Sequence, residues 1–309
     1  MNSSLQTKRL ALQFDVTAAA GFGEPMQLAV ELLLPLGKAP ALLFVCIPGG
    51  GMNRRYFDLP TPEGEAEVSF ARTMLEKGHA VLLIDPIGVG DSSKPSDPYE
   101  LHPERAAAAN AEAISQIVEG LRAGTMMENF PPAPDMRIVG AAHSYGALLM
   151  VLHEAKTPIY DGVCLMGFHT CGLPVQINEE DRALDPLYAR EHLIDLSRKR
   201  FTMSTITMTP SPSKRPVSAV SATDVIYLTS SYMMMLPELA TPDAAAIKTP
   251  VMLVLGDGDL HPDTHATPAA YSGSSDVTLI VLSETRHNHF VYPSRTYLFE
   301  RVARWAASL

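Results

Sequence analysis

The feature that most constrains the fold is a set of short, continuously apolar runs that recur along the chain. Runs without polar interruptions are typical of parallel strands that are covered on both faces. They occupy residues 41–47, 80–84, 138–141, 163–166, 251–255 and 277–282. Segments with helical spacing or Ala-rich composition accompany them, at residues 65–77, 103–121 and 297–307. Strands that alternate with helices predict right-handed crossovers and a mostly parallel sheet.

Two parts of the chain depart from this pattern. Apolar and polar residues alternate at 10–16 and 26–34, which predicts an antiparallel hairpin of half-buried strands at a sheet edge. Between residues 171 and 247 there is no parallel-strand run, and the pattern predicts helices at 188–200 and 223–236. We therefore expect a core domain of residues 1–170 and 248–309, with residues 171–247 inserted as a helical cap. A Ser-, Thr-, Pro- and Lys-rich linker at 207–216 is expected to be the mobile part of the cap.

One stretch, residues 137–150, reads as a strand, a tight turn and a helix start with a serine at the apex. Ser144 has a small residue two positions before it, Ala142, and a glycine two positions after it, Gly146. Small flanks let the strand and helix backbones approach closely, and the serine itself is expected to have strained backbone angles. Its hydroxyl would then lie at a helix N-terminus, where N–H groups face any developing negative charge. An ordinary turn that happens to contain serine is the alternative.

Further motifs follow the apolar runs in a recognisable order. They are Ile-Pro-Gly-Gly-Gly-Met-Asn at 47–53, Asp-Pro-Ile-Gly-Val-Gly-Asp-Ser at 85–92, Gly-Asp-Gly-Asp-Leu-His-Pro at 256–262 and Arg-His-Asn-His-Phe at 286–290. With Ser144 between the second and third, this series resembles the alpha/beta-hydrolase family, although Pro48 stands where that family usually has His. The resemblance covers nearly all of the chain except the cap. It implies an α/β fold with a mostly parallel central sheet flanked by helices.

The resemblance also implies a Ser-His-Asp triad with Ser144 as the nucleophile. It places the acid at Asp259, with Asp257 as a rival whose other role would be to cap the turn. For the base we expect His289, which directly precedes an aromatic residue, with His287 as the rival.

The oxyanion donors implied by the same resemblance are the backbone N–H groups of Tyr145 and Gly50, with Gly51 as the alternative to Gly50. Met233, Met234 and Met235 are either core filler or an adaptable apolar wall for a substrate. The residues expected to contact the substrate are Gly51, Met52, His143 and Met234.

Two other kinds of site have partial support in the sequence. A glycine-rich loop can cradle a phosphate, but no Lys-Ser/Thr follows this one as in a P-loop, and Arg54 and Arg55 are expected to form a solvated face. His261 and His265, with His287 and His289, could bind zinc, but a loop containing proline gives no supporting contacts. We expect neither a metal nor a cofactor.

The net charge of -10 and the pI near 5.4 argue against nucleic acid as a partner. The N-terminus lacks the apolar run of a signal peptide, and no apolar stretch is long enough to span a bilayer. Only three cysteines occur, so no disulfide framework is implied. These observations predict a cytoplasmic protein that binds a small-molecule substrate and no membrane, with a homodimer left open.

Together these expectations describe a serine hydrolase that cleaves an ester or lactone of a mainly apolar, medium-sized substrate. Serine at the turn argues against relatives that hydrolyse haloalkanes or epoxides, in which the resemblance implies aspartate at this position. It leaves open C–C bond hydrolysis, amide hydrolysis and acyl transfer, since one triad serves all of them. A non-catalytic ligand-binding protein on the same scaffold is the remaining alternative.

Overall fold

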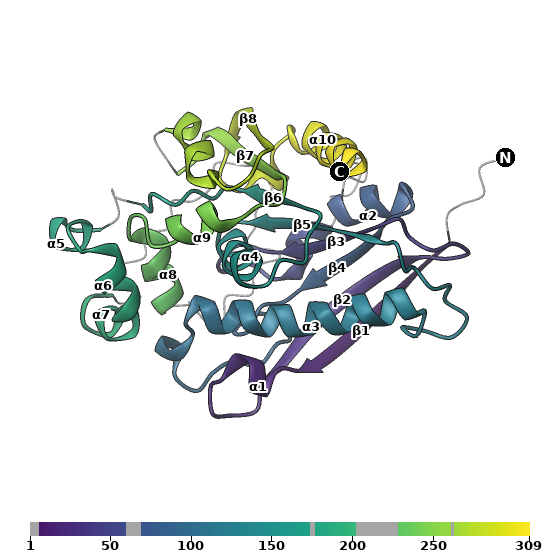
Figure 1. The fold of residues 1–309 in the computed structure, drawn as a ribbon, viewed down its shortest axis with the longest axis horizontal. Helices are drawn as coiled ribbons and strands as arrows, with labels where there is room; N and C mark the ends of the chain where they lie inside the picture. The colour runs from purple at the N-terminus through teal and green to yellow at the C-terminus, as the bar shows by residue number, and fades with distance from the viewer. Residues whose placement is uncertain (1–5, 60–68, 174–176, 202–227, 261–262) are drawn as a thin grey trace.

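An eight-stranded, mostly parallel sheet forms the centre of the computed structural model, which describes residues 6–59, 69–173, 177–201, 228–260 and 263–309 (Figure 1). The strand order is β1-β2-β4-β3-β5-β6-β7-β8. β3 to β8 run parallel, β1 pairs antiparallel with β2, and β2 pairs antiparallel with β4. The strands are β1 (Thr7–Asp15), β2 (Gln27–Pro35), β3 (Leu42–Ile47), β4 (Ala80–Ile84), β5 (Arg137–His143), β6 (Gly162–Met166), β7 (Val251–Gly258) and β8 (Val277–Arg286). The expected fold class and the edge hairpin are both confirmed.

Helices cover both faces of this sheet, so successive residues of each parallel strand are buried on opposite sides. In β3, Val45 joins the core under α3 and α4, whereas Phe44 joins the core under α2 and α10. This explains why the parallel strands are apolar at every position. The main helices are α2 (Phe70–Glu76), α3 (Pro103–Ala123), α4 (Tyr145–Lys156) and α10 (Arg295–Ser308), and a short helix, α1 (Thr17–Ala20), lies in the edge hairpin.

The segment at 171–247 contributes short helices at one end of the sheet (Figure 1). They are α5 (Glu179–Arg182), α6 (Pro186–Glu191), α7 (Leu193–Arg200), α8 (Leu228–Met235) and α9 (Thr241–Ala246). The prediction of a single helix at 188–200 is wrong. The helix is interrupted at His192, because its φ of -108° and ψ of 20° lie outside the helical range. The linker at 207–216 lies outside the described residues, as do residues 65–68 of the helix expected at 65–77 and residues 223–227 of the helix expected at 223–236.

No helix in the described ranges is both long and apolar enough to cross a membrane. The thiols of Cys46 and Cys164 are buried within β3 and β6, where they pack as small apolar groups.

Candidate active site

Ser144 lies at a sharp turn between β5 and α4. Its φ is 51° and its ψ is -115°, a strained combination for a residue with a side chain, as expected from the sequence. The turn is so tight that a Cβ atom at Gly146 would lie 2.3 Å from the Ile47 carbonyl oxygen and 2.5 Å from that of Pro48. Only glycine fits there, so this residue allows α4 to start directly against the end of β3.

His287 is the imidazole that lies against Ser144. Its Nε2 atom is 2.9 Å from the Ser144 Oγ atom, and its Nδ1 atom is 2.7 Å from Oδ1 of Asp259. A carboxylate can only accept, so Nδ1 carries the proton and Nε2 accepts from the serine hydroxyl. The three side chains come from the carboxyl ends of β5, β7 and β8, and form one hydrogen-bonded series.

His289 does not occupy the position expected from the sequence. Its Nε2 atom lies 3.0 Å from Oδ2 of Asp259, on the other side of the carboxylate from His287, and its side chain is fully buried. The reason is local geometry: β8 ends at Arg286, so His287 is the first residue beyond the strand, whereas His289 opens the 3₁₀ helix η6 (His289–Val291) that turns into the core. The prediction of His289 as the partner of Ser144 is therefore wrong, and the rival His287 takes that place.

Asp259 and Asp257 have separate surroundings. Asp259 has a buried side chain and also accepts N–H groups from Gly256 at 3.2 Å and Leu260 at 2.8 Å. Burial alone would raise its pKa, but the hydrogen bonds from His287 and His289 outweigh burial and hold the pKa well below the usual range. Asp257 instead accepts the N–H groups of Glu284 and Thr285 on β8, at 2.8 and 3.1 Å. It therefore holds β8 in place, and among the described residues no hydrogen bond joins it to a histidine.

The glycine loop after β3 lies beside the start of α4. A Cβ atom at Gly50 would lie 3.7 Å from the Cβ atom of Tyr145, so the two residues expected to supply oxyanion donors are neighbours. Gly51 has a φ of 70°, a conformation that favours glycine. Met52 is buried, and its backbone N–H donates to the Gly49 carbonyl at 3.1 Å, which closes the loop.

His143 joins this loop to the loop that carries His287. Its Nε2–H donates to the main-chain carbonyl of His287 at 2.8 Å, and a Cβ atom at Gly49 would lie only 2.6 Å from its Nδ1 atom. The ring is fully buried, and burial, together with the neighbouring imidazoles, holds its pKa well below the usual value. A buried, neutral His143 supports the site from beneath. Its contact with substrate stays a prediction.

α8 contacts the turn at Ser144 through a series of hydroxyl groups. Ser230 donates to the Leu101 carbonyl at 2.7 Å, so it accepts from the Tyr145 hydroxyl, 3.1 Å away. On the same helix Met233 and Met235 are buried in the core, and Met234 is only half-buried. Of the three methionines, Met234 therefore retains the most exposed surface. The Ser230 contact was missed in the sequence because nothing local indicates its partners, which lie far along the chain.

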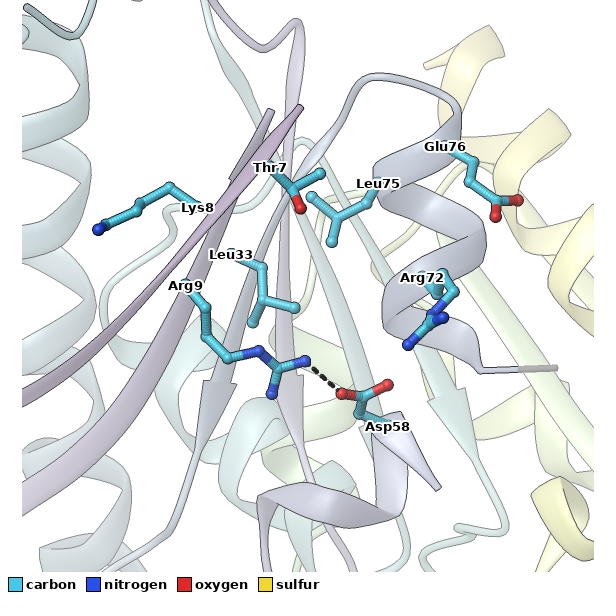
Figure 2. A pocket seen from close by; sticks show the side chains of 8 residues that line it. All are labelled: Thr7, Lys8, Arg9, Leu33, Asp58, Arg72, Leu75 and Glu76. Carbon is cyan, nitrogen blue, oxygen red and sulfur yellow. Dashed lines mark hydrogen bonds and ion pairs between the residues drawn. The ribbon is translucent and has the colours of Figure 1, made fainter. Parts of the chain in front are cut away.

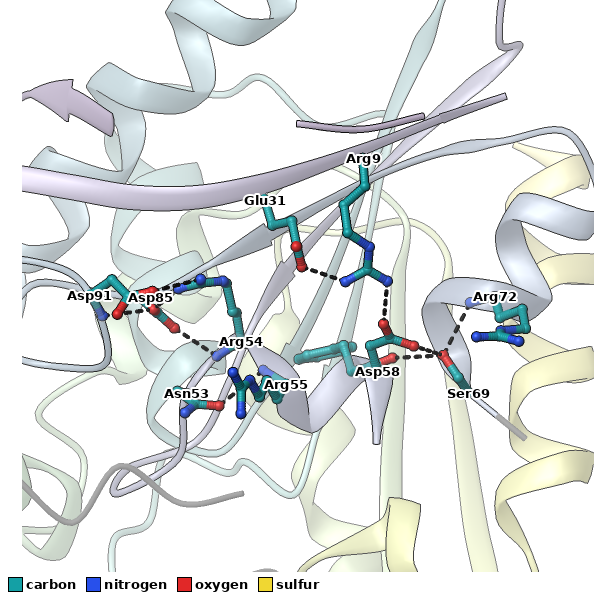
Figure 3. A network of polar contacts seen from close by, with 11 residues as sticks. Arg9, Glu31, Asn53, Arg54, Arg55, Asp58, Ser69, Arg72, Asp85 and Asp91 are labelled. Carbon is teal, nitrogen blue, oxygen red and sulfur yellow. Dashed lines mark hydrogen bonds and ion pairs between the residues drawn. The ribbon is translucent and has the colours of Figure 1, made fainter. Parts of the chain in front are cut away.

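Arg54 is not the solvated residue that the sequence predicted. Its guanidinium forms ion pairs with Asp85 and Asp91, and its backbone N–H donates to Asp85 at 2.7 Å (Figure 3). The Asp85 side chain, at the end of β4, is fully buried, so the cation offsets the cost of burying a carboxylate. This ion pair fastens the 3₁₀ helix η1 (Arg54–Asp58), and with it the glycine loop, to the sheet. Arg55 is exposed as expected.

A cavity of about 470 Å³ lies elsewhere, between the start of β1, η1 and α2 (Figure 2). Its polar wall includes Arg9, which is paired with Asp58 and Glu31, and none of its lining residues belongs to the Ser144 site. No group of three or more His, Cys, Asp and Glu residues is arranged to hold a metal ion within the described ranges. His261, one of the histidines considered for zinc, lies outside those ranges.

Comparisons with known proteins show the family of the chain. A sequence model of the alpha/beta hydrolase family matches residues 44–298, and the chain belongs to that family. No curated protein matches the chain by sequence.

Among solved structures, a thermophilic esterase from Thermogutta terrifontis is 14% identical, with a TM-score of 0.63 and coverage of 97% of this chain and 98% of that one. The esterase RhEst1 from Rhodococcus sp. ECU1013 is 14% identical, with a TM-score of 0.59 and coverage of 98% and 99%. The epoxide hydrolase VrEH1 from Vigna radiata is 10% identical, with a TM-score of 0.60 and coverage of 98% of each chain. At identities this low, these structural similarities establish a shared fold and nothing further.

Proposed function

We propose that this protein is a serine hydrolase that cleaves a carboxylic ester or lactone through an acyl-enzyme. The observation that carries the proposal is the His287 ring, which contacts both Ser144 and Asp259. Serine is a poor nucleophile at neutral pH, so an imidazole that accepts its proton is the group it needs. The esterases among the structural neighbours are compatible with this chemistry.

In the proposed reaction the Ser144 Oγ atom attacks the carbonyl carbon while its proton passes to Nε2 of His287. Asp259, kept ionised, stabilises the imidazolium that forms. The N–H groups of Tyr145 and Gly50 bind the oxyanion, and His287 returns the proton to the leaving alkoxide oxygen. A water molecule, deprotonated by the same imidazole, then releases the acid and restores Ser144.

Residues 171–247 act in this proposal as a cap that shields the acyl-enzyme and selects the substrate. The hydrogen bond between Tyr145 and Ser230 supports a place for α8 close to the nucleophile. Met234, the methionine of this helix that is only half-buried, is the proposed apolar contact. Replacing Met234 by Ala should change the ranking of acyl chain lengths, whereas Met233→Ala should mainly lower stability.

A panel of p-nitrophenyl esters, lactones and anilides tests the reaction class. We expect turnover of esters or lactones that exceeds turnover of anilides with the same acyl group and is absent in Ser144→Ala. The proposed function would be excluded if the protein hydrolysed none of these compounds and no serine-directed fluorophosphonate labelled it.

A further inference from the structure

The carboxylate of Asp259 is shared by two imidazoles. His287 contacts Oδ1 at 2.7 Å and His289 contacts Oδ2 at 3.0 Å, while Gly256 and Leu260 each add a backbone N–H. A triad needs one imidazole on its carboxylate, so the second is an addition that the proposed function leaves unexplained.

The two ring nitrogens of His289 have different surroundings. Its Nε2 atom faces a carboxylate and so carries a proton, whereas its Nδ1 atom is buried and has no partner among the residues that the structure describes. The ring is therefore oriented by one hydrogen bond between its side chain and the described residues, the one that Nε2–H donates to Asp259.

We propose that His289 is a positioning residue that orients Asp259 toward His287 and takes up part of its negative charge, so that it sets the pH at which His287 can act as a base. This inference rests on the proposed function. The donated hydrogen bond fixes the carboxylate plane, and it also reduces the charge that Asp259 offers to a protonated His287.

Several other titratable groups lie around His289. His143 lies 5.7 Å away between ring centroids, and burial keeps its pKa well below the usual value, so it stays neutral. Tyr56, on η1, accepts the N–H of Phe290 at 3.4 Å, and burial raises its pKa. Asp259 accepts from the ring, and His287 lies on the other side of that carboxylate. Tyr292, directly after η6, donates its N–H to the His289 carbonyl at 3.2 Å.

The experiment uses the full chain and the rate at which a fluorophosphonate labels Ser144 as a function of pH. His289→Gln retains an N–H donor of similar reach, and His289→Leu removes it at similar size. His153 provides the matched control: it is another buried histidine, in α4, which contacts Tyr160 instead of the site. We compare His153→Gln and His153→Leu with the two His289 variants.

We expect His289→Leu to lower the maximal labelling rate by about tenfold, the scale of one hydrogen bond to a charged group. It should also move the midpoint of the acid limb upward by roughly half a pH unit, because Asp259 then offers its full charge to His287. His289→Gln should restore both values, and the His153 variants should leave both unchanged. An unmoved midpoint in His289→Leu, or an equal loss in His289→Gln, would overturn the proposal and leave only ring packing.

Histidine N–H signals in ¹⁵N-labelled protein separate this inference from the proposed function, because they need no reaction. Asp259→Asn should shift the signals of both His287 Nδ1–H and His289 Nε2–H. A shift of the His287 signal alone would disprove the shared carboxylate. Failure of the wild-type protein to label, with both signals shifted, would instead contradict the hydrolase function and leave the shared carboxylate intact.

Discussion

His143 holds the main chain of His287: its Nε2–H donates to the His287 carbonyl oxygen at 2.8 Å. His143 directly precedes Ser144 at the end of β5. The strand that carries the proposed nucleophile is therefore fastened directly to the loop that carries the proposed base. The distance between the side chains of Ser144 and His287 therefore depends on a hydrogen bond in which neither side chain takes part.

Replacing His143 by Leu should disturb this arrangement without removing any reacting group. The His287 carbonyl would lose one of two donors, since the N–H of His289 also reaches it at 3.1 Å, and the lost hydrogen bond costs about 1 kcal/mol of stability. The base loop would also shift, so we expect turnover to fall by at least about tenfold. Thermal melts and ester turnover measured together check this prediction, and unchanged turnover would show that the loop holds its position by other contacts.

Asp259→Asn and Asp257→Asn should differ sharply. Asn at 259 can present an N–H to Nδ1 of His287 and favour the wrong tautomer, so turnover should fall by about three to four orders of magnitude. Asp257 accepts the backbone N–H groups of Glu284 and Thr285 on β8, so its replacement should change stability slightly and turnover little. Steady-state kinetics of the purified variants decide between them. Equal losses would mean that Asp257 also serves the reaction.

Two glycines of the site should respond differently to alanine. At Gly146 a methyl group would overlap the carbonyl oxygens at the end of β3, so Gly146→Ala should lower stability by several kcal/mol. At Gly50 the nearest atom is at ordinary contact distance, so Gly50→Ala should fold and melt as the wild type does. Any loss of turnover in Gly50→Ala would then report on the oxyanion loop. A strongly destabilised Gly50→Ala would contradict the loop geometry described above.

Glu104 should make the junction of α3, α4 and α6 sensitive to acid. Burial raises its pKa, but hydrogen bonds and charge from Lys156 and Arg190 outweigh this and lower it to about 2. Because the folded pKa lies below the unfolded one, the contribution to stability is present above about pH 4.5 and is lost as the pH falls toward 2. The side chain is 31% exposed, so screening limits the contribution to roughly 1 kcal/mol.

Urea unfolding of the wild type and of Glu104→Gln at pH 6 and pH 3 checks this. The wild type should be the more stable at pH 6, and the difference should shrink at pH 3. A difference that stays constant over this range would mean that the ion pairs do not set the stability of the junction.

Much of this fold can be predicted from the sequence because parallel strands are apolar at every position. The run at 80–84 matches β4 and the run at 41–47 contains β3, since both strands are covered on both faces. The turn at Ser144 is equally readable, because the backbone approach at Gly146 admits one residue type. The break at His192 was missed because helical spacing continues across it.

The choice between His287 and His289 could not be made from the sequence. Residues two apart near the end of a strand point to the same side, and both imidazoles do reach Asp259. Which one also faces Ser144 depends on where β8 ends and η6 begins, and spacing does not encode that boundary. Arg54 was misjudged for a similar reason, since its partner Asp85 lies 31 residues away and is buried by the sheet.

The most direct test of the account is mass-spectrometric mapping of fluorophosphonate labelling in the wild type, His287→Ala and His289→Ala. We predict that the probe modifies Ser144 in the wild type, that His287→Ala lowers the labelling rate by at least about a thousandfold, and that His289→Ala retains a rate well above that of His287→Ala. Rapid labelling of Ser144 in His287→Ala, together with its loss in His289→Ala, would contradict the account.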